Sequence, residues 1–242
     1  SSEARISGGQ FADIDMTENS KVSTLAGYLG EGRAFADKDS GDIVNGYVTS
    51  LKNVTVLPHA HDCRWNTETH EKSCVCGYVE ATDSDAPVIS GIENGKTYYG
   101  AAEFTVTDDN DFTVTVDGNP VLPENDRFTL AADNEQHTIA ATDAAGNAAV
   151  ITVSVMKLYS VTLPSGAGFT ATGANTAGHG TDYTFKVDIA EGYSKTGSYR
   201  VLVNGSAVDG IMGDETGDTF LLTGVSGSMT ITVEGVADIT PP

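Results

Sequence analysis

The stretch DFTVTVDGNPV, residues 111–121, decides the fold class of this chain. Phe112, Val114 and Val116 alternate with threonines, which is the side-chain period of a half-buried β-strand. Asp117-Gly118 follows directly and predicts a turn, because glycine reaches backbone conformations that other residues avoid. This part of the chain is therefore expected to be β-structure between tight turns.

The same alternation continues on both sides of this stretch and predicts a β-sandwich over residues 86–157. Phe104 and Val106 face one way in the preceding segment, as the alternating residues of 112–116 do. Turn residues separate these segments. The predicted strands cover residues 87–92, 103–108, 111–116, 127–132, 137–142 and 150–155.

A second copy of the pattern occupies the last third of the chain. YRVLVNGSAV (199–208) matches FTVTVDGNPV (112–121) in its aromatic, valine and Asp/Asn-Gly positions. A second sandwich is therefore predicted over 158–242, with strands at 181–189, 198–205, 219–224 and 229–235, ending in the start of a further linker. Aligning Phe128 with Phe220 sets the copies about 90 residues apart, whereas aligning ITV at 151 with ITV at 231 gives a shift of 80 residues. Both registers stay open.

Composition and charge narrow the function classes. The net charge is −21, and each predicted segment is acidic, so nucleic acid and anionic lipid are not expected partners. No apolar run approaches the roughly 20 residues needed to span a bilayer, so no membrane insertion is expected. One short helical pattern, residues 22–32, places Val22, Leu25, Ala26 and Leu29 on one face.

The stretch HAHDCRWNTETHEKSCVCGY, residues 59–78, contains all three cysteines and three of the five histidines. Structural zinc sites take four ligands from cysteine and histidine. A segment this short cannot form an apolar core large enough to fold by itself. The predicted ligands of a structural zinc ion are His61, His70, Cys74 and Cys76, with His59 and Cys63 as alternates.

Other interpretations of the cluster stay open. Cys63 with Cys74 or Cys76 would close a disulfide loop worth roughly 3 kcal/mol in the chain-entropy model, or the segment binds nothing. Calcium is a second candidate metal, at the oxygen-rich run Asp108-Asp109-Asn110-Asp111, for which a solvated turn is the competing interpretation. His137 and His179 lie alone beside strands and are interpreted as surface positions. No catalytic motif is found.

Several stretches resemble cell-surface proteins of Gram-positive bacteria. DAP (85–87), TYYGAAEFTVTDDN and ATDAAGNAAVITVSV resemble bacterial Ig-like domains that occur in tandem arrays. ISGGQF (6–11), LAGYLGEGRAFADKDSGDIV and LKNVTV (51–56) are similar to the last coil and cap of right-handed β-helical adhesin-type proteins. Residues 59–77 resemble a short His/Cys motif found between repeats of such proteins, from which Cys63 departs.

The resemblance implies an all-β architecture in four parts: a β-helix cap (1–58), a His/Cys knuckle and linker (59–85), and two Ig-like sandwiches (86–157 and 158–242). It also implies a secreted or surface-attached bacterial protein, monomeric, acting in adhesion or as a stalk. A host glycan or matrix protein is the expected partner, and no enzymatic activity is expected. The alternative is an accessory carbohydrate-binding module of a glycan-degrading enzyme.

Overall fold

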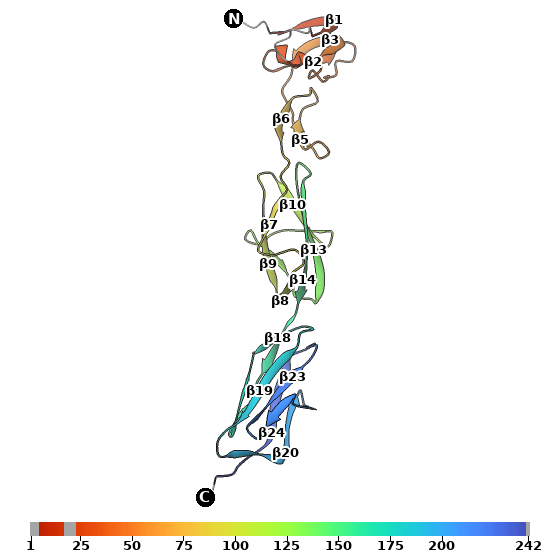
Figure 1. The fold of residues 1–242 in the computed structure, drawn as a ribbon. Helices are drawn as coiled ribbons and strands as arrows, with labels where there is room; N and C mark the ends of the chain where they lie inside the picture. The colour runs from red at the N-terminus through yellow and green to blue at the C-terminus, as the bar shows by residue number, and fades with distance from the viewer. Residues whose placement is uncertain (1–4, 17–22, 241–242) are drawn as a thin grey trace. The chain divides into compact units, whose positions relative to one another are not determined.

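The computed structural model describes residues 5–16 and 23–240, and these residues form an all-β chain (Figure 1). Their only helix is a single 3-10 turn, η1 (Leu25–Tyr28). Of the helix predicted over 22–32, the described residues contain only this turn. Val22 lies outside the described residues. Leu29 already has an extended backbone (φ −69°, ψ 145°). So short a segment cannot offset the cost of nucleating an α-helix.

The chain divides into two compact units. The first unit comprises Ser1–Ile89, Val106–Thr115 and Ala140–Val150, and the second comprises Ser90–Thr105, Val116–Ile139 and Ile151–Pro242. The four-part division expected from the sequence stays a prediction.

The first unit begins with a three-stranded antiparallel sheet in the order β1-β3-β2. Its strands are β1 (Gly9–Asp15), β2 (Arg33–Asp37) and β3 (Ser50–Pro58). Leu25, Phe35, Val54 and Val56 are buried together on it. Because successive rungs of a β-helix pair in parallel, these antiparallel pairs are not rungs, and a β-helix cap stays a prediction here.

A thin second sheet of the same unit follows, in the order β4-β5-β6. Its strands are β4 (Arg64–Asn66), β5 (Glu71–Ser73) and β6 (Val79–Thr82). None of the residues in these three strands is buried. Apolar burial therefore contributes little to this sheet, and another interaction must hold it.

Residues 86–157 form a five-stranded sheet, β11-β10-β13-β14-β8, and a three-stranded sheet, β12-β9-β7, consistent with a β-sandwich. The strands are β7 (Val88–Ser90), β8 (Thr97–Tyr99), β9 (Ala102–Thr107), β10 (Phe112–Val116), β11 (Asn119–Val121), β12 (Phe128–Leu130), β13 (Glu135–Asp143) and β14 (Ala148–Met156). The six predicted strands are present. β8 and β11 were not predicted.

The last third is a β-sandwich of two five-stranded sheets, β18-β15-β24-β20-β21 and β16-β17-β19-β23-β22. Both sheets contribute to one core, in which Phe185 of one sheet and Ile231 of the other are about 1 % exposed. The strands are β15 (Leu158–Thr162), β16 (Ser165–Gly166), β17 (Phe169–Gly173), β18 (Thr176–Gly178), β19 (Tyr183–Ile189), β20 (Tyr193–Val203), β21 (Ser206–Val208), β22 (Met212–Asp214), β23 (Gly217–Leu222) and β24 (Met229–Asp238).

The two matching stretches form equivalent hairpins. Asp117 (φ 52°) joins β10 to β11, and Asn204 (φ 50°) joins β20 to β21, each followed by a glycine at positive φ. The Asp117 N–H donates to the Thr138 carbonyl and Asp117 Oδ1 accepts from the Thr138 N–H, both at 2.8 Å. Asn204 makes the same pair of bonds to Thr230, at 2.9 and 2.8 Å. This equivalence matches the register near 90 residues.

The other register also has a structural counterpart. β14 pairs in parallel with β8, near the start of its sandwich, and β24 pairs in parallel with β15 in the same way. β24 also pairs antiparallel with β20. In the first sandwich the equivalent neighbour of β10 is β13 rather than β14. One strand of the second sandwich thus corresponds to two strands of the first, so the architectures are similar while the topologies differ.

Candidate metal centre

The two histidines of the candidate site come from the loop that leaves the first sheet. His59 directly follows β3, and its N–H donates to the Gly32 carbonyl at 2.8 Å, which fixes the start of the loop. His61 lies two residues on, and its ring stacks on Tyr78 with centroids 4.3 Å apart. The two imidazole rings are 5.4 Å apart in an edge arrangement. Backbone and ring contacts therefore hold both histidines on one side of the knuckle.

The two cysteines come from a tight turn after β5. The Cys74 carbonyl accepts from the Gly77 N–H, and the Cys74 N–H donates to the Tyr78 carbonyl, both at 2.8 Å. Gly77 has a φ of +88°, and a Cβ there would lie 2.0 Å from Asn45 Oδ1. Only glycine fits this position, so Gly77 allows the reversal that points both thiols inward.

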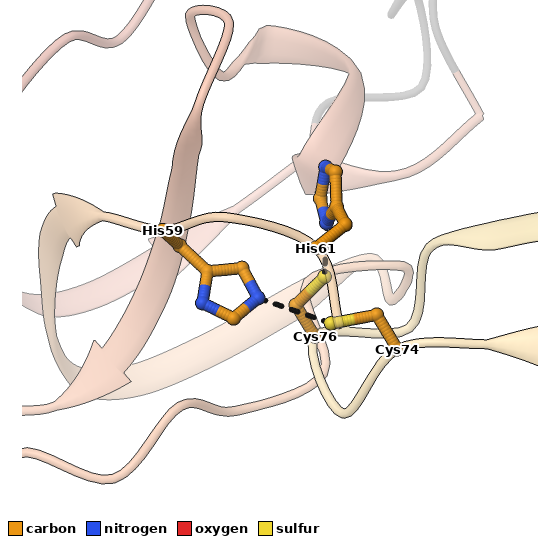
Figure 2. A group of neighbouring side chains, drawn as sticks. All are labelled: His59, His61, Cys74 and Cys76. Atoms are coloured by element: carbon orange, nitrogen blue, oxygen red, sulfur yellow. Dashed lines mark hydrogen bonds between the residues drawn. The ribbon is translucent and has the colours of Figure 1, made fainter. Parts of the chain in front are cut away.

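Figure 2 shows the four side chains of this His/Cys group converging. His59 Nε2 lies 3.0 Å from Cys74 Sγ, and His61 Nδ1 lies 3.3 Å from Cys76 Sγ. All four ligand atoms lie within 4.8 Å of one another. Zinc bond lengths in a tetrahedral site imply sulfur–nitrogen separations of about 3.5 Å. The group therefore fits a zinc ion with two cysteine and two histidine ligands.

The buried environment of the two sulfur atoms favours binding of a cation. Cys74 and Cys76 are each 5 % exposed and share a small core with Ala34. Burial raises the pKa of the Cys76 thiol, since a thiolate is poorly solvated there. A bound divalent cation compensates this cost, because its charge stabilises thiolate ligands directly.

The structure brings together three of the four predicted ligands: His61, Cys74 and Cys76. The fourth position is taken by His59, one of the two alternates. His70 lies outside the His/Cys group, because it ends the β4–β5 turn at a φ of 57° and its Nδ1 faces the Ala145 carbonyl at 2.9 Å. A pattern in the sequence does mark the observed set: two pairs with one residue between the partners, His-x-His and Cys-x-Cys.

Cys63 packs against the core of the two buried cysteines but is not part of the His/Cys group. Cys63, Cys74 and Cys76 are all free thiols in the structure, so the disulfide alternative is not formed there. The same core contains Ile43 and Tyr78 rather than Trp65. The zinc site therefore does not explain the position of Trp65.

The predicted calcium run does not act as one cluster. Asp108 lies in a group with Asp83 and Asp143, whereas Asp109 and Asp111 do not belong to that group. Asn110 of the run donates to Asp83 Oδ2 at 2.7 Å.

The third member of that group, Asp143, is buried and accepts hydrogen bonds from the Asn147 N–H and side-chain amide, each at 2.9 Å. Burial raises the pKa of this carboxyl, but these bonds outweigh it and lower the pKa overall. The acidic group is thus explained as a hydrogen-bonded turn network.

A cavity of about 320 Å³ adjoins the His/Cys group, with His61 and Cys76 in its wall. It is also lined by Ala34, Tyr47 and Tyr78. The fold of the first sheet creates this cavity, because its β2 strand supplies part of the wall.

Two further findings bear on identity. No helix in the part of the chain that the structure describes combines the length and apolar character required to cross a membrane. No model of a known protein family matches the chain, and no curated protein matches its sequence.

Proposed function

We propose that this chain is a non-enzymatic spacer segment of an extracellular bacterial surface protein, stiffened by a structural zinc ion. The convergence of His59, His61, Cys74 and Cys76 carries the proposal. A zinc ion held by these residues would cross-link the exit of the first sheet to the turn after β5. The β4-β5-β6 sheet has no buried residue of its own, so it has most to gain from such a link.

The ligand set favours a structural rather than a catalytic ion. Catalytic zinc sites keep one coordination position open for water or substrate, whereas structural sites fill four positions with protein ligands. Four protein ligands are available here. Zinc binding contributes about 10–16 kcal/mol in zinc-finger peptides, where it is also folding free energy. A binding free energy of that size is enough to stabilise a small sheet that has no apolar core.

Lys157, the single residue that connects β14 to β15, supports a spacer role. The Lys157 N–H donates to Asn134 Oδ1 at 2.8 Å, and the Lys157 carbonyl accepts from the His179 N–H at 2.9 Å. A linker residue whose backbone is bonded on both sides loses much of its freedom. A stalk needs such junctions, because flexible linkers leave its reach undefined.

The sequence resemblances support the finer parts of the proposal. They favour Ig-like sandwiches after a β-helix cap, a secreted or surface-attached monomer, and adhesion to a host glycan or matrix protein. The net charge of −21 suits an exposed, soluble surface.

Elemental analysis of purified protein tests the proposal, with one zinc per chain as the expected result. Hydrogen exchange of residues 59–85 should then accelerate on chelation, while exchange in the core strands β19 and β24 should not change. Metal-free protein with a disulfide at Cys63 would refute the zinc site. Turnover of a polysaccharide, peptide or ester substrate, abolished by one Asp, Glu or His substitution, would refute the spacer role.

A further inference from the structure

Trp65 lies in an open polar groove that neither the zinc site nor the spacer role explains. It is the only tryptophan of the chain and is half-buried in β4, an edge strand of the thin sheet. It stands opposite Lys72 of β5. A large, partly exposed aromatic side chain on an edge strand is an informative observation, because most such rings are buried in cores or used at binding sites.

The groove beside Trp65 has a volume of about 540 Å³ and is lined mainly by polar side chains. Asn66, Glu68 and Ser73 line the same groove as Trp65 and carry amide, carboxylate and hydroxyl groups. Arg64 lies at the same groove, with its guanidinium held by Asp62 at 3.1 Å. One cation and one anion in the lining leave the groove itself close to neutral.

This combination suits a sugar ring. A pyranose has one apolar C–H face that can lie on the negative face of an indole, and a rim of hydroxyl groups that hydrogen-bond to amide, carboxylate and hydroxyl partners. Binding sites of this kind orient the ligand with a few polar groups beside an aromatic wall. Grooves for proline-rich peptides are lined by aromatic residues, and Trp65 is the only aromatic residue of this lining.

The charge of the whole chain decides between glycan classes. A net charge of −21 repels polyanionic glycans over about the Debye length. We propose that the groove at Trp65 binds a neutral oligosaccharide, with one pyranose ring stacked on the indole. This inference does not require the spacer role, but it rests on the proposed zinc site, because Cys74 also lines the groove and the zinc ion would hold the sheet that forms it. Zinc content and sugar binding are measured separately, so failure of one is distinguishable from failure of the other.

Tryptophan fluorescence provides a direct test, because every change in tryptophan emission must come from Trp65. The metal-replete chain is titrated with hexasaccharides of β-1,4-glucan, β-1,4-xylan, β-1,4-mannan and α-1,4-glucan. A heparin hexasaccharide and a proline-rich peptide form two further arms. We expect a saturable change in emission with at least one neutral hexasaccharide and none with heparin.

Variants then locate the site by calorimetry with the hexasaccharide that binds. Trp65→Ala should weaken binding at least about tenfold, Trp65→Phe should retain part of it, and Glu68→Ala should weaken it without touching the ring. Leu122→Ala is the surface control, because this side chain directly after β11 is 91 % exposed, and it should bind as the parent does. Circular dichroism checks that each variant is folded. If Trp65→Ala is unfolded, the affinity of Glu68→Ala tests the position of the site instead.

The proposal is overturned if no neutral hexasaccharide gives a signal, or if Trp65→Ala and Glu68→Ala bind as tightly as the parent. Binding of only heparin or only the proline-rich peptide overturns it as well, in favour of those ligands.

Discussion

Replacing His59 with alanine is expected to weaken zinc binding strongly. His59 Nε2 lies 3.0 Å from Cys74 Sγ, so the variant removes one of four ligands. Loss of a residue that only orients a zinc ligand costs about 10–100-fold in affinity, so loss of the ligand itself should cost at least the upper value. Bound zinc stabilises the folded chain by RT ln(1 + [L]/Kd), where [L] is the concentration of free zinc. A 100-fold rise in Kd therefore lowers the free energy of unfolding at saturating zinc by about 2.7 kcal/mol.

His70→Ala is the matched control, because His70 lies in the same segment and was a predicted ligand. Its Nδ1 faces the Ala145 carbonyl at 2.9 Å, so the variant loses one hydrogen bond, worth about 1 kcal/mol. That loss should be the same with and without zinc. Zinc affinity should remain that of the parent.

The assay measures zinc affinity by competition with a chromophoric chelator and unfolding with and without zinc. The expected result is a reduced zinc-dependent stabilisation in His59→Ala and an unchanged one in His70→Ala. The opposite result, in which His70→Ala loses zinc and His59→Ala keeps it, would refute the ligand assignment drawn from the structure.

Three further predictions concern other sites. Gly77→Ala should weaken zinc binding in the same competition assay, because its φ of +88° is strained for alanine and the added Cβ has no room; parent-like affinity would contradict this. Phe185→Ala should lower the free energy of unfolding in urea by about 3–5 kcal/mol, because the ring is 1 % exposed in the core; a loss below about 1 kcal/mol would show a loose core. His137 lies between Asp117 and Asp133, at 2.8 and 3.1 Å, with a side chain only 12 % exposed. Burial opposes its charge, but these two hydrogen bonds outweigh it and raise the pKa of His137. A raised folded-state pKa gives stability that is complete below the unfolded value of about 6.5 and is lost as pH rises through the folded value. The loss of melting temperature in His137→Gln should thus be larger at pH 5.5 than at pH 8.5, and an equal loss at both would contradict it.

Local sequence patterns determined the strands and turns of the sandwiches. The alternation in 112–116 and the Asp-Gly and Asn-Gly pairs are properties of neighbouring residues, so they predict β-strands and turns without knowledge of the rest of the chain. The matching stretches 112–121 and 199–208 form equivalent hairpins for the same reason. β8 and β11 were not predicted, because the adjacent Tyr98 and Tyr99 break the alternation in β8 and Pro120 is unfavourable within a strand such as β11.

The environment of single side chains was beyond the sequence. His137 was interpreted as a surface position, yet two carboxylates from separate turns enclose it. Nothing next to His137 in the sequence marks that arrangement. Burial of a polar side chain depends on which loops meet, and loops far apart in the sequence meet only in the folded chain.

The sequence by itself placed a candidate metal-binding group of cysteine and histidine within residues 59–78, because all three cysteines and three of the five histidines are concentrated there. Only the tertiary structure decided which histidines join Cys74 and Cys76. The Gly32 carbonyl fixes His59 on the side of the thiols, while the Ala145 carbonyl, 75 residues away in sequence, faces His70 outside the group. Ligand choice depends on the direction of each side chain in space, and contacts distant in sequence set that direction.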